Sequence, residues 1–167
     1  MIAPREYDLY WSQLENSDFF LLSIYILVSV IPFVNAIREK TSIALAMVLS
    51  LLLVMFVRFT FSILELDFNE IHFFSLYPFI ADDPTQIHRF LTSAWLHADW
   101  IHVLSNILVI GLVGVPLEQR LGAKRWLLVY FLGFIGGNLA WVASHPDSIN
   151  PAIGASGAAF GLLGAYM

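Results

Sequence analysis

The sequence predicts an all-α, polytopic membrane protein whose apolar helices form a transmembrane bundle. Of its residues, 59% are hydrophobic and only 13% are charged, whereas a soluble domain is typically about half apolar and one-quarter charged. The apolar residues collect into runs long enough to cross a hydrocarbon core of about 30 Å. Backbone polar groups in that core must be satisfied within the segment itself, and this favours helices.

The polar composition excludes several functional classes. The formal net charge is −5 and no run of Lys or Arg forms a basic surface, so we expect no nucleic-acid partner. The absence of cysteine excludes disulfides, thiolate metal sites and a cysteine nucleophile. We expect neither a metal nor a cofactor, and the lipid bilayer is the partner that the composition indicates. The sequence does not indicate an oligomeric state.

Four apolar segments and the start of a fifth define the expected spans. The segments are residues 19–36, 41–64, 100–116 and 126–143, and the fifth begins at Ser156. We assign residues 1–40 to an N-terminal tail with one extra transmembrane helix, and residues 41–167 to a partial core. The tail is rich in acidic residues, which is the wrong charge for a signal peptide, so the first span should be retained.

Two polar features interrupt the apolar pattern. Arg58 lies about two turns before the end of the second span, and we expect its side chain to snorkel to the interface rather than to act in a site. Residues 65–96 mix charged and aromatic side chains. Aromatic residues favour the headgroup layer, so this segment is expected to be a functional interfacial loop, with an ordinary linker as the alternative.

Small residues concentrate in the later spans. All ten glycines lie at or after Gly111, including the Gly133/Gly137 and Gly157/Gly161 pairs at four-residue spacing. Close helix contacts, and with them the active core, are therefore expected there.

Ser156 is the candidate chemical centre of the chain. It lies among small side chains, and Gly154 and Gly157 allow close backbone approach and sharp turns. A helix that starts here would direct free N–H groups at an anion formed beside the Ser156 oxygen. This would be half of an acyl-transfer site. The alternative is a helix face of small residues that packs closely against a neighbour in lipid.

His102 and Asn106 are four residues apart and therefore share one helix face. Both project from the outer end of the third span, where they could jointly bind an oxyanion beside Ser156. They could equally form interhelical hydrogen bonds, which is a normal use of such residues in membranes.

Together, the Gly154–Gly157 helix start, His97, His102 and Asn106 resemble the rhomboid intramembrane serine proteases. The resemblance covers roughly residues 42–167 and leaves the first span outside the six-helix core of the family.

Two further segments extend the resemblance. Arg89 resembles the arginine of the family's Trp-Arg pair in the first loop, although His88 stands where the family has tryptophan. The segment Glu118–Gly122 resembles the end of the family's second core helix.

The resemblance implies a role for each matching residue. Ser156 would be the nucleophile, and His102, Asn106 and the Ser156 backbone N–H would form an oxyanion hole shaped by Gly154. His97 and Arg89 would support the site, and Phe160 matches an aromatic position that packs on the catalytic histidine.

One departure from the family concerns the general base, which is a histidine on the sixth core helix. Only twelve residues run from Ser156 to Met167, about 18 Å of helix. We therefore expect a truncated sequence with an incomplete last helix, a catalytic histidine downstream, and no activity for the chain as given. His145 could be a substitute base, but a histidine in a polar loop is more often merely solvated.

The resemblance implies an intramembrane serine endopeptidase that cleaves transmembrane segments of membrane proteins through an acyl-enzyme on Ser156. The alternative is a catalytically inactive rhomboid-like protein that binds membrane clients. A transporter would be expected to place ionisable residues through the midplane, and a soluble esterase would have the second glycine of a nucleophile elbow.

The distribution of Lys and Arg predicts the orientation. The connections after the first and third spans are basic, so they should face the cytoplasm. This orientation places the N-terminus and the opening of the candidate site at Ser156 on the non-cytoplasmic side.

This topology predicts a labelling pattern. Cysteines introduced at positions 39 and 122 should be shielded from an impermeant thiol reagent applied outside, whereas one at position 148 should be labelled. The opposite labelling pattern would refute this topology.

Overall fold

The computed structural model describes residues 14–66, 70–78 and 86–167. Within these ranges, four helices are long and apolar enough to cross a membrane. They are α1 (Asn16–Glu39), α2 (Ile43–Ile63), the continuous helical stretch Trp100–Leu121 and α7 (Ala123–Ser144). The all-helical, multi-pass prediction is confirmed. The tail at residues 1–13 and the loop acids Asp67, Asp82 and Asp83 lie outside the described residues.

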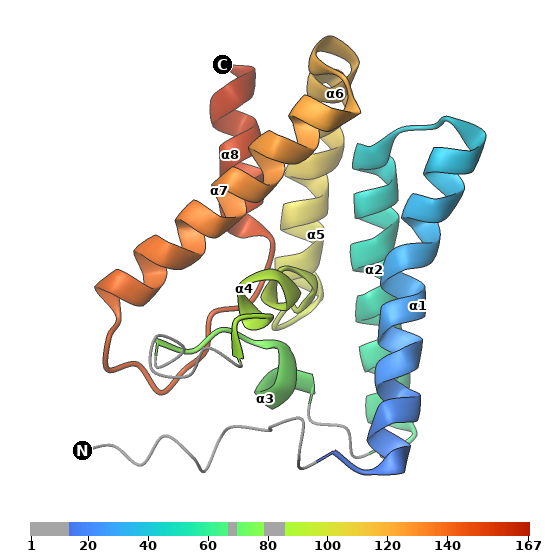
Figure 1. Ribbon diagram of the computed structural model, residues 1–167, viewed down its shortest axis with the longest axis vertical. Coiled ribbons are helices and arrows are strands. Elements are labelled where there is room, and N and C mark those ends of the chain that lie inside the picture. Colours follow the sequence, from blue (N-terminus) through green and yellow to red (C-terminus); the bar gives the residue numbers. More distant parts are fainter. Residues whose placement is uncertain (1–13, 67–69, 79–85) are drawn as a thin grey trace.

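Helices α1 and α2 form an antiparallel pair at one side of the bundle (Figure 1). Lys40 ends α1 in the left-handed conformation, and Ser42 begins α2 by accepting a hydrogen bond from the Leu45 N–H. The Glu118 carboxylate also accepts hydrogen bonds from the Ile43 and Ala44 N–H groups, both at 2.9 Å. Because the first N–H groups of a helix lack internal partners and favour negative charge, this distant carboxylate fixes the start of α2.

The third span is longer than predicted. It consists of α5 (Trp100–Val109), a π-helical turn (Ile110–Gly114) and α6 (Val115–Leu121). Pro116 does not end the helix. It is the second residue of α6, which follows directly on the π-helical turn, and the helical stretch continues through it. The polar turn expected at residues 118–125 is reduced to Gly122, whose φ of 78° separates α6 from α7.

Helix α8 (Ser156–Tyr166) packs on α7 with almost no side chain between the two backbones. A Cβ added at Gly133 would lie 2.9 Å from both the Gly157 carbonyl oxygen and the Gly161 Cα. The expectation that the glycine pairs mark close helix contacts is confirmed here.

The segment between α2 and α5 folds back under the bundle as short helices, α3 (Glu70–Phe74) and α4 (Arg89–Thr92), followed by the 3₁₀ turn Ser93–Trp95 (Figure 1). Leu76 and Ala152 exchange backbone hydrogen bonds of 3.0 and 2.8 Å. This segment is therefore attached to the residues that lead into Ser156.

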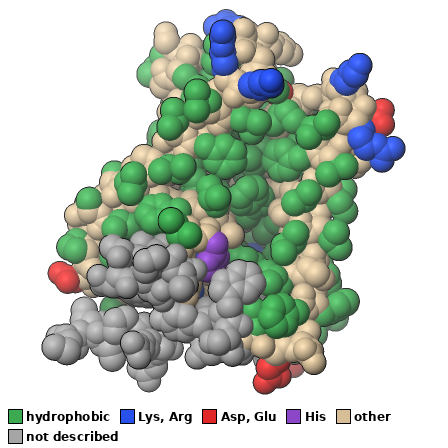
Figure 2. Space-filling model, in the orientation of Figure 1, with side chains coloured by type: hydrophobic (Ala, Val, Ile, Leu, Met, Phe, Trp, Pro, Cys, Tyr) green, Lys and Arg blue, Asp and Glu red, His purple; other side chains and the backbone are tan. Residues whose placement is uncertain are grey.

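Charge is distributed unevenly along the bundle. On the face in Figure 2, Lys and Arg gather at the end where α1 meets α2 and α6 meets α7, and hydrophobic side chains cover the middle. The two basic connections therefore lie at the same end of the molecule.

Two glycines of α7 provide a matched test of the α7–α8 contact. Gly133→Ala would force the backbones apart, and we expect it to destabilise the protein by about 1–3 kcal/mol, as for other overpacked sites. At Gly136 an added Cβ meets nothing within 4 Å, so Gly136→Ala should be neutral or slightly stabilising, because alanine favours the helix. Unfolding in detergent measures both variants, and equal effects would contradict a specific glycine contact.

Candidate active site

Ser156 is the first residue of α8, and no side chain caps the start of this helix. Gly154 adopts a φ of 104°, which favours glycine, and its N–H donates to the Ser93 carbonyl oxygen at 2.8 Å. The chain thus turns sharply into α8 and leaves the Ser156 hydroxyl half-buried, beside the uncapped N–H groups.

His102 lies directly against this turn. A Cβ on Gly154 would be 2.6 Å from the His102 Nε2 and 2.8 Å from its Cε1, so only glycine lets the ring come this close. The Ala98 N–H lies 3.5 Å from His102 Nδ1 as a donor. When Nδ1 acts as this acceptor, Nε2 is the nitrogen that can donate, and Nε2 faces the turn before Ser156.

Asn106 lies one turn further along α5 and is buried, with 5% of its surface exposed. Its Nδ2 donor has no hydrogen-bond partner within the part of the chain that the structure describes. Leaving a buried amide donor unpaired costs free energy, so the arrangement suits a donor that is satisfied by a bound group.

His97 connects this site to the start of α8. Its side chain is 1% exposed, its Nε2 accepts the Ala155 N–H at 3.4 Å, and its ring packs edge-on against His102 with centroids 4.9 Å apart. Burial, aided by the neighbouring His102, lowers the pKa of His97 to about 4. His97 is therefore a neutral acceptor at physiological pH.

The other predicted residues lie further from this cluster. Arg89 is wholly buried within the segment between α2 and α5, where it donates to the Gln86 side chain at 2.8 Å and to the Ser75 carbonyl oxygen at 3.0 Å. Phe160 lies on the surface of α8, 73% exposed. His145 is exposed at the end of α7, stacked on Trp141.

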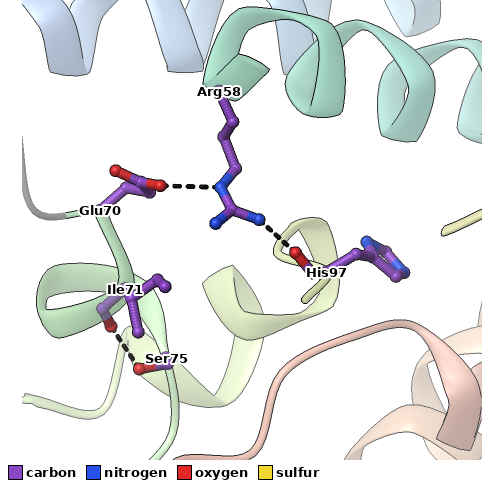
Figure 3. Close-up of polar contacts among 5 residues, drawn as sticks. All are labelled: Arg58, Glu70, Ile71, Ser75 and His97. Atoms are coloured by element: carbon purple, nitrogen blue, oxygen red, sulfur yellow. Dashed lines mark hydrogen bonds and ion pairs between the residues drawn. The ribbon is translucent and has the colours of Figure 1, made fainter. Parts of the chain in front are cut away.

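Arg58 has partners that the sequence did not indicate. Its side chain is 13% exposed, and its guanidinium lies between Glu70 and His97 (Figure 3). Its Nε donates to Glu70 Oε1 at 2.8 Å, and its Nη1 donates to the His97 carbonyl oxygen. The sequence contains only a weak signal for this ion pair, because it shows a cation near the end of a span and an acidic residue twelve positions later.

Comparison with known proteins agrees with this geometry. The fold and the site define a polytopic membrane protein with a serine at a helix start and two side-chain donors on a neighbouring helix. The family model of the rhomboid domain matches residues 84–167. The chain belongs to the rhomboid family.

Three curated relatives illustrate the similarity. RHOMBOID-like protein 1 of Arabidopsis thaliana is 42% identical over 82 residues, which cover 49% of this chain and 21% of the relative. Rhomboid-like protease 3 of Toxoplasma gondii is 38% identical over 79 residues, covering 47% and 29%. The putative rhomboid protease YdcA of Bacillus subtilis (strain 168) is 42% identical over 80 residues, covering 47% and 39%. The match thus spans well under half the length of these relatives, and no solved structure matches the chain.

The neutral state of His97 predicts acid sensitivity. The pKa of His97 is about 4 in the folded protein and about 6.5 in an unfolded chain. Between these values the unfolded state binds more protons, so stability should fall as the pH drops from about 6.5 towards 4. We expect the unfolding midpoint of His97→Gln in detergent to fall less steeply with decreasing pH than that of the wild type. The control His145→Gln, at an exposed site, should keep the wild-type pH dependence. Equal slopes for all three proteins would contradict the prediction.

Proposed function

We propose that this chain supplies the nucleophile and the oxyanion hole of an intramembrane serine endopeptidase that cleaves transmembrane segments of membrane proteins. The observation that carries the proposal is the position of His102 Nε2 against Gly154, two residues before Ser156. Membership of the rhomboid family, which includes relatives named as proteases, supports the reaction class.

The proposed chemistry begins with attack of the Ser156 Oγ on a substrate carbonyl carbon. The oxygen of the tetrahedral intermediate would be stabilised by the Ser156 N–H, the His102 Nε2–H and the Asn106 amide. Collapse of this intermediate would release the amine and leave an acyl-enzyme, which water hydrolyses. A general base would take the serine proton and return it to the leaving amine, and the family resemblance implies a histidine for this role.

The alternative role of His102 and Asn106 was interhelical hydrogen bonding. Within the described residues, the Asn106 Nδ2 bonds to no neighbouring helix, and the His102 Nε2 lies against the turn before Ser156. These positions favour a role for both side chains as hydrogen-bond donors to a reacting group in a water-poor site.

The orientation is part of the proposal. The two basic connections lie at one end of the bundle (Figure 2), and basic loops favour the cytoplasmic side. We place Ser156 near the non-cytoplasmic face, where a transmembrane substrate and water can both reach it.

The direct test uses the full-length protein in liposomes with a model transmembrane substrate and a serine-directed phosphonate. Wild type should cleave the substrate and be labelled, and Ser156→Ala should abolish both. The loop variant Ser148→Ala is the matched control and should retain both. Cleavage by Ser156→Ala would remove this residue from the mechanism, and an unreactive wild type would favour an inactive protein that binds membrane clients.

The oxyanion hole is tested separately. Loss of one donor should lower kcat by on the order of tenfold to a thousandfold, with residual activity, because other donors remain. We expect this for His102→Ala and for Asn106→Ala in the same assay. Turnover at the wild-type rate in both variants would refute the assignment of these donors.

A further inference from the structure

The cluster around Arg58 is not explained by the proposed chemistry. Arg58 comes from α2 and Glu70 begins α3, whereas His97 lies just before α5 (Figure 3). The guanidinium bridges the other two residues by donating to the Glu70 carboxylate at 2.8 Å and to the His97 carbonyl oxygen. It thereby joins three elements that are distant in the sequence.

The backbone carbonyl and the imidazole ring of His97 contact different partners. Its carbonyl oxygen accepts from Arg58, while the imidazole extends away from Arg58 (Figure 3). There the ring accepts the Ala155 N–H at 3.4 Å and packs against His102. His97 therefore links the Arg58–Glu70 ion pair to the start of α8 and to the His102 ring, which belong to the candidate site.

We propose that Arg58, held by Glu70, is a positioning residue that fixes His97 and, through it, the start of α8 and the His102 ring. The inference rests on the proposed function, because it concerns the geometry of the same nucleophile and oxyanion hole. It adds a residue outside the site that controls how well the site is aligned.

The ion pair suits this role better than a neutral side chain. The side chains of Arg58 and Glu70 are only 13% and 18% exposed, so their attraction is screened less than at an open surface. The planar guanidinium also offers several donors in a fixed fork. When Glu70 holds Nε, the direction of Nη1 towards the His97 carbonyl oxygen is largely set.

A simpler role is anchoring of the segment that contains α3. Arg58 would then hold Glu70, and the bond to His97 would be incidental. The two roles differ at Ala155, because its N–H bonds to His97, whereas the Ala152 N–H bonds to Leu76 just after α3.

Residue-resolved amide hydrogen exchange distinguishes these roles without any need for catalysis. In Arg58→Gln, we expect exchange at Ala155 to accelerate by about tenfold or more, because the charge-assisted bond that fixes His97 is lost. Arg38→Gln is the matched control, since Arg38 is exposed near the end of α1, and it should leave Ala155 unchanged. Faster exchange at Glu70 to Leu76 and Ala152, with Ala155 unchanged, would overturn the proposal in favour of simple anchoring.

A milder variant covers the case in which Arg58→Gln fails to fold. Glu70→Gln keeps an acceptor for Nε but removes the charge, so Ala155 should exchange faster in the same direction and to a smaller extent. Where Arg58→Gln does fold, amide exchange at Ala155 in the double variant should be only slightly faster than in Arg58→Gln, because both changes act through one contact. No change at Ala155 in Glu70→Gln, or fully additive effects, would overturn the role of Glu70.

Kinetics in the full-length protein provide the second measurement. Per active site titrated with a phosphonate, kcat of Arg58→Gln should fall by about tenfold or more while KM stays within about twofold, as expected for a misaligned site that still binds substrate. Unchanged kcat would overturn the positioning role. If wild type is unreactive but Ala155 exchange responds as predicted, the proposed function fails while the assignment of Arg58 to the α8 start stands.

Discussion

The backbone contact between α7 and α8 is the constraint on which the candidate site depends. Lipid tails are as apolar as leucine, so helices in a bilayer associate through close packing and hydrogen bonds rather than through the hydrophobic effect. Gly133 meets Gly157 and Gly161 at distances that exclude a Cβ, and α8 lies closely against α7 while also contacting α5. The turn at Gly154 leads into this helix and lies against the His102 ring.

Charged side chains secure the irregular ends of the helices by opposite means. The Glu118 carboxylate accepts from N–H groups at the start of α2, where a helix has donors without partners. Near the other end of α2, the guanidinium of Arg58 donates to the His97 carbonyl before α5. Arg89 donates to the carbonyl of His72 in α3 and to that of Ser75 just after α3. Backbone outside regular helices near a membrane needs such partners. The negative carboxylate meets N–H donors, and the positive guanidinium groups meet carbonyl acceptors.

Hydropathy and glycine spacing were sufficient to predict the spans and the close α7–α8 contact, because both depend on residues near one another in the sequence. The roles of Ser156, His102 and Asn106 remain predictions that rest on their order and on family resemblance. The partners of Arg58, Glu70 and His97, were not predicted, because they belong to other elements and only folding brings them together. The continuation of the third span past Pro116 was missed because proline commonly ends a helix, whereas here it follows a π-helical turn within one helical stretch.

The position of Arg58 is also consistent with the protonation state that His97 needs. To accept the Ala155 N–H, the Nε2 of His97 must be unprotonated. Burial is the main cause that lowers the pKa of His97, and the neighbouring His102 is the second. A hydrogen bond to the Trp95 backbone raises the pKa, and the positive charge of Arg58 lowers it by the smallest of these effects. A guanidinium at the carbonyl side thus fixes the backbone and at the same time opposes protonation of the ring. The protonation state of His97 therefore depends mainly on its burial, and Arg58 acts chiefly through its hydrogen bond to the His97 carbonyl oxygen.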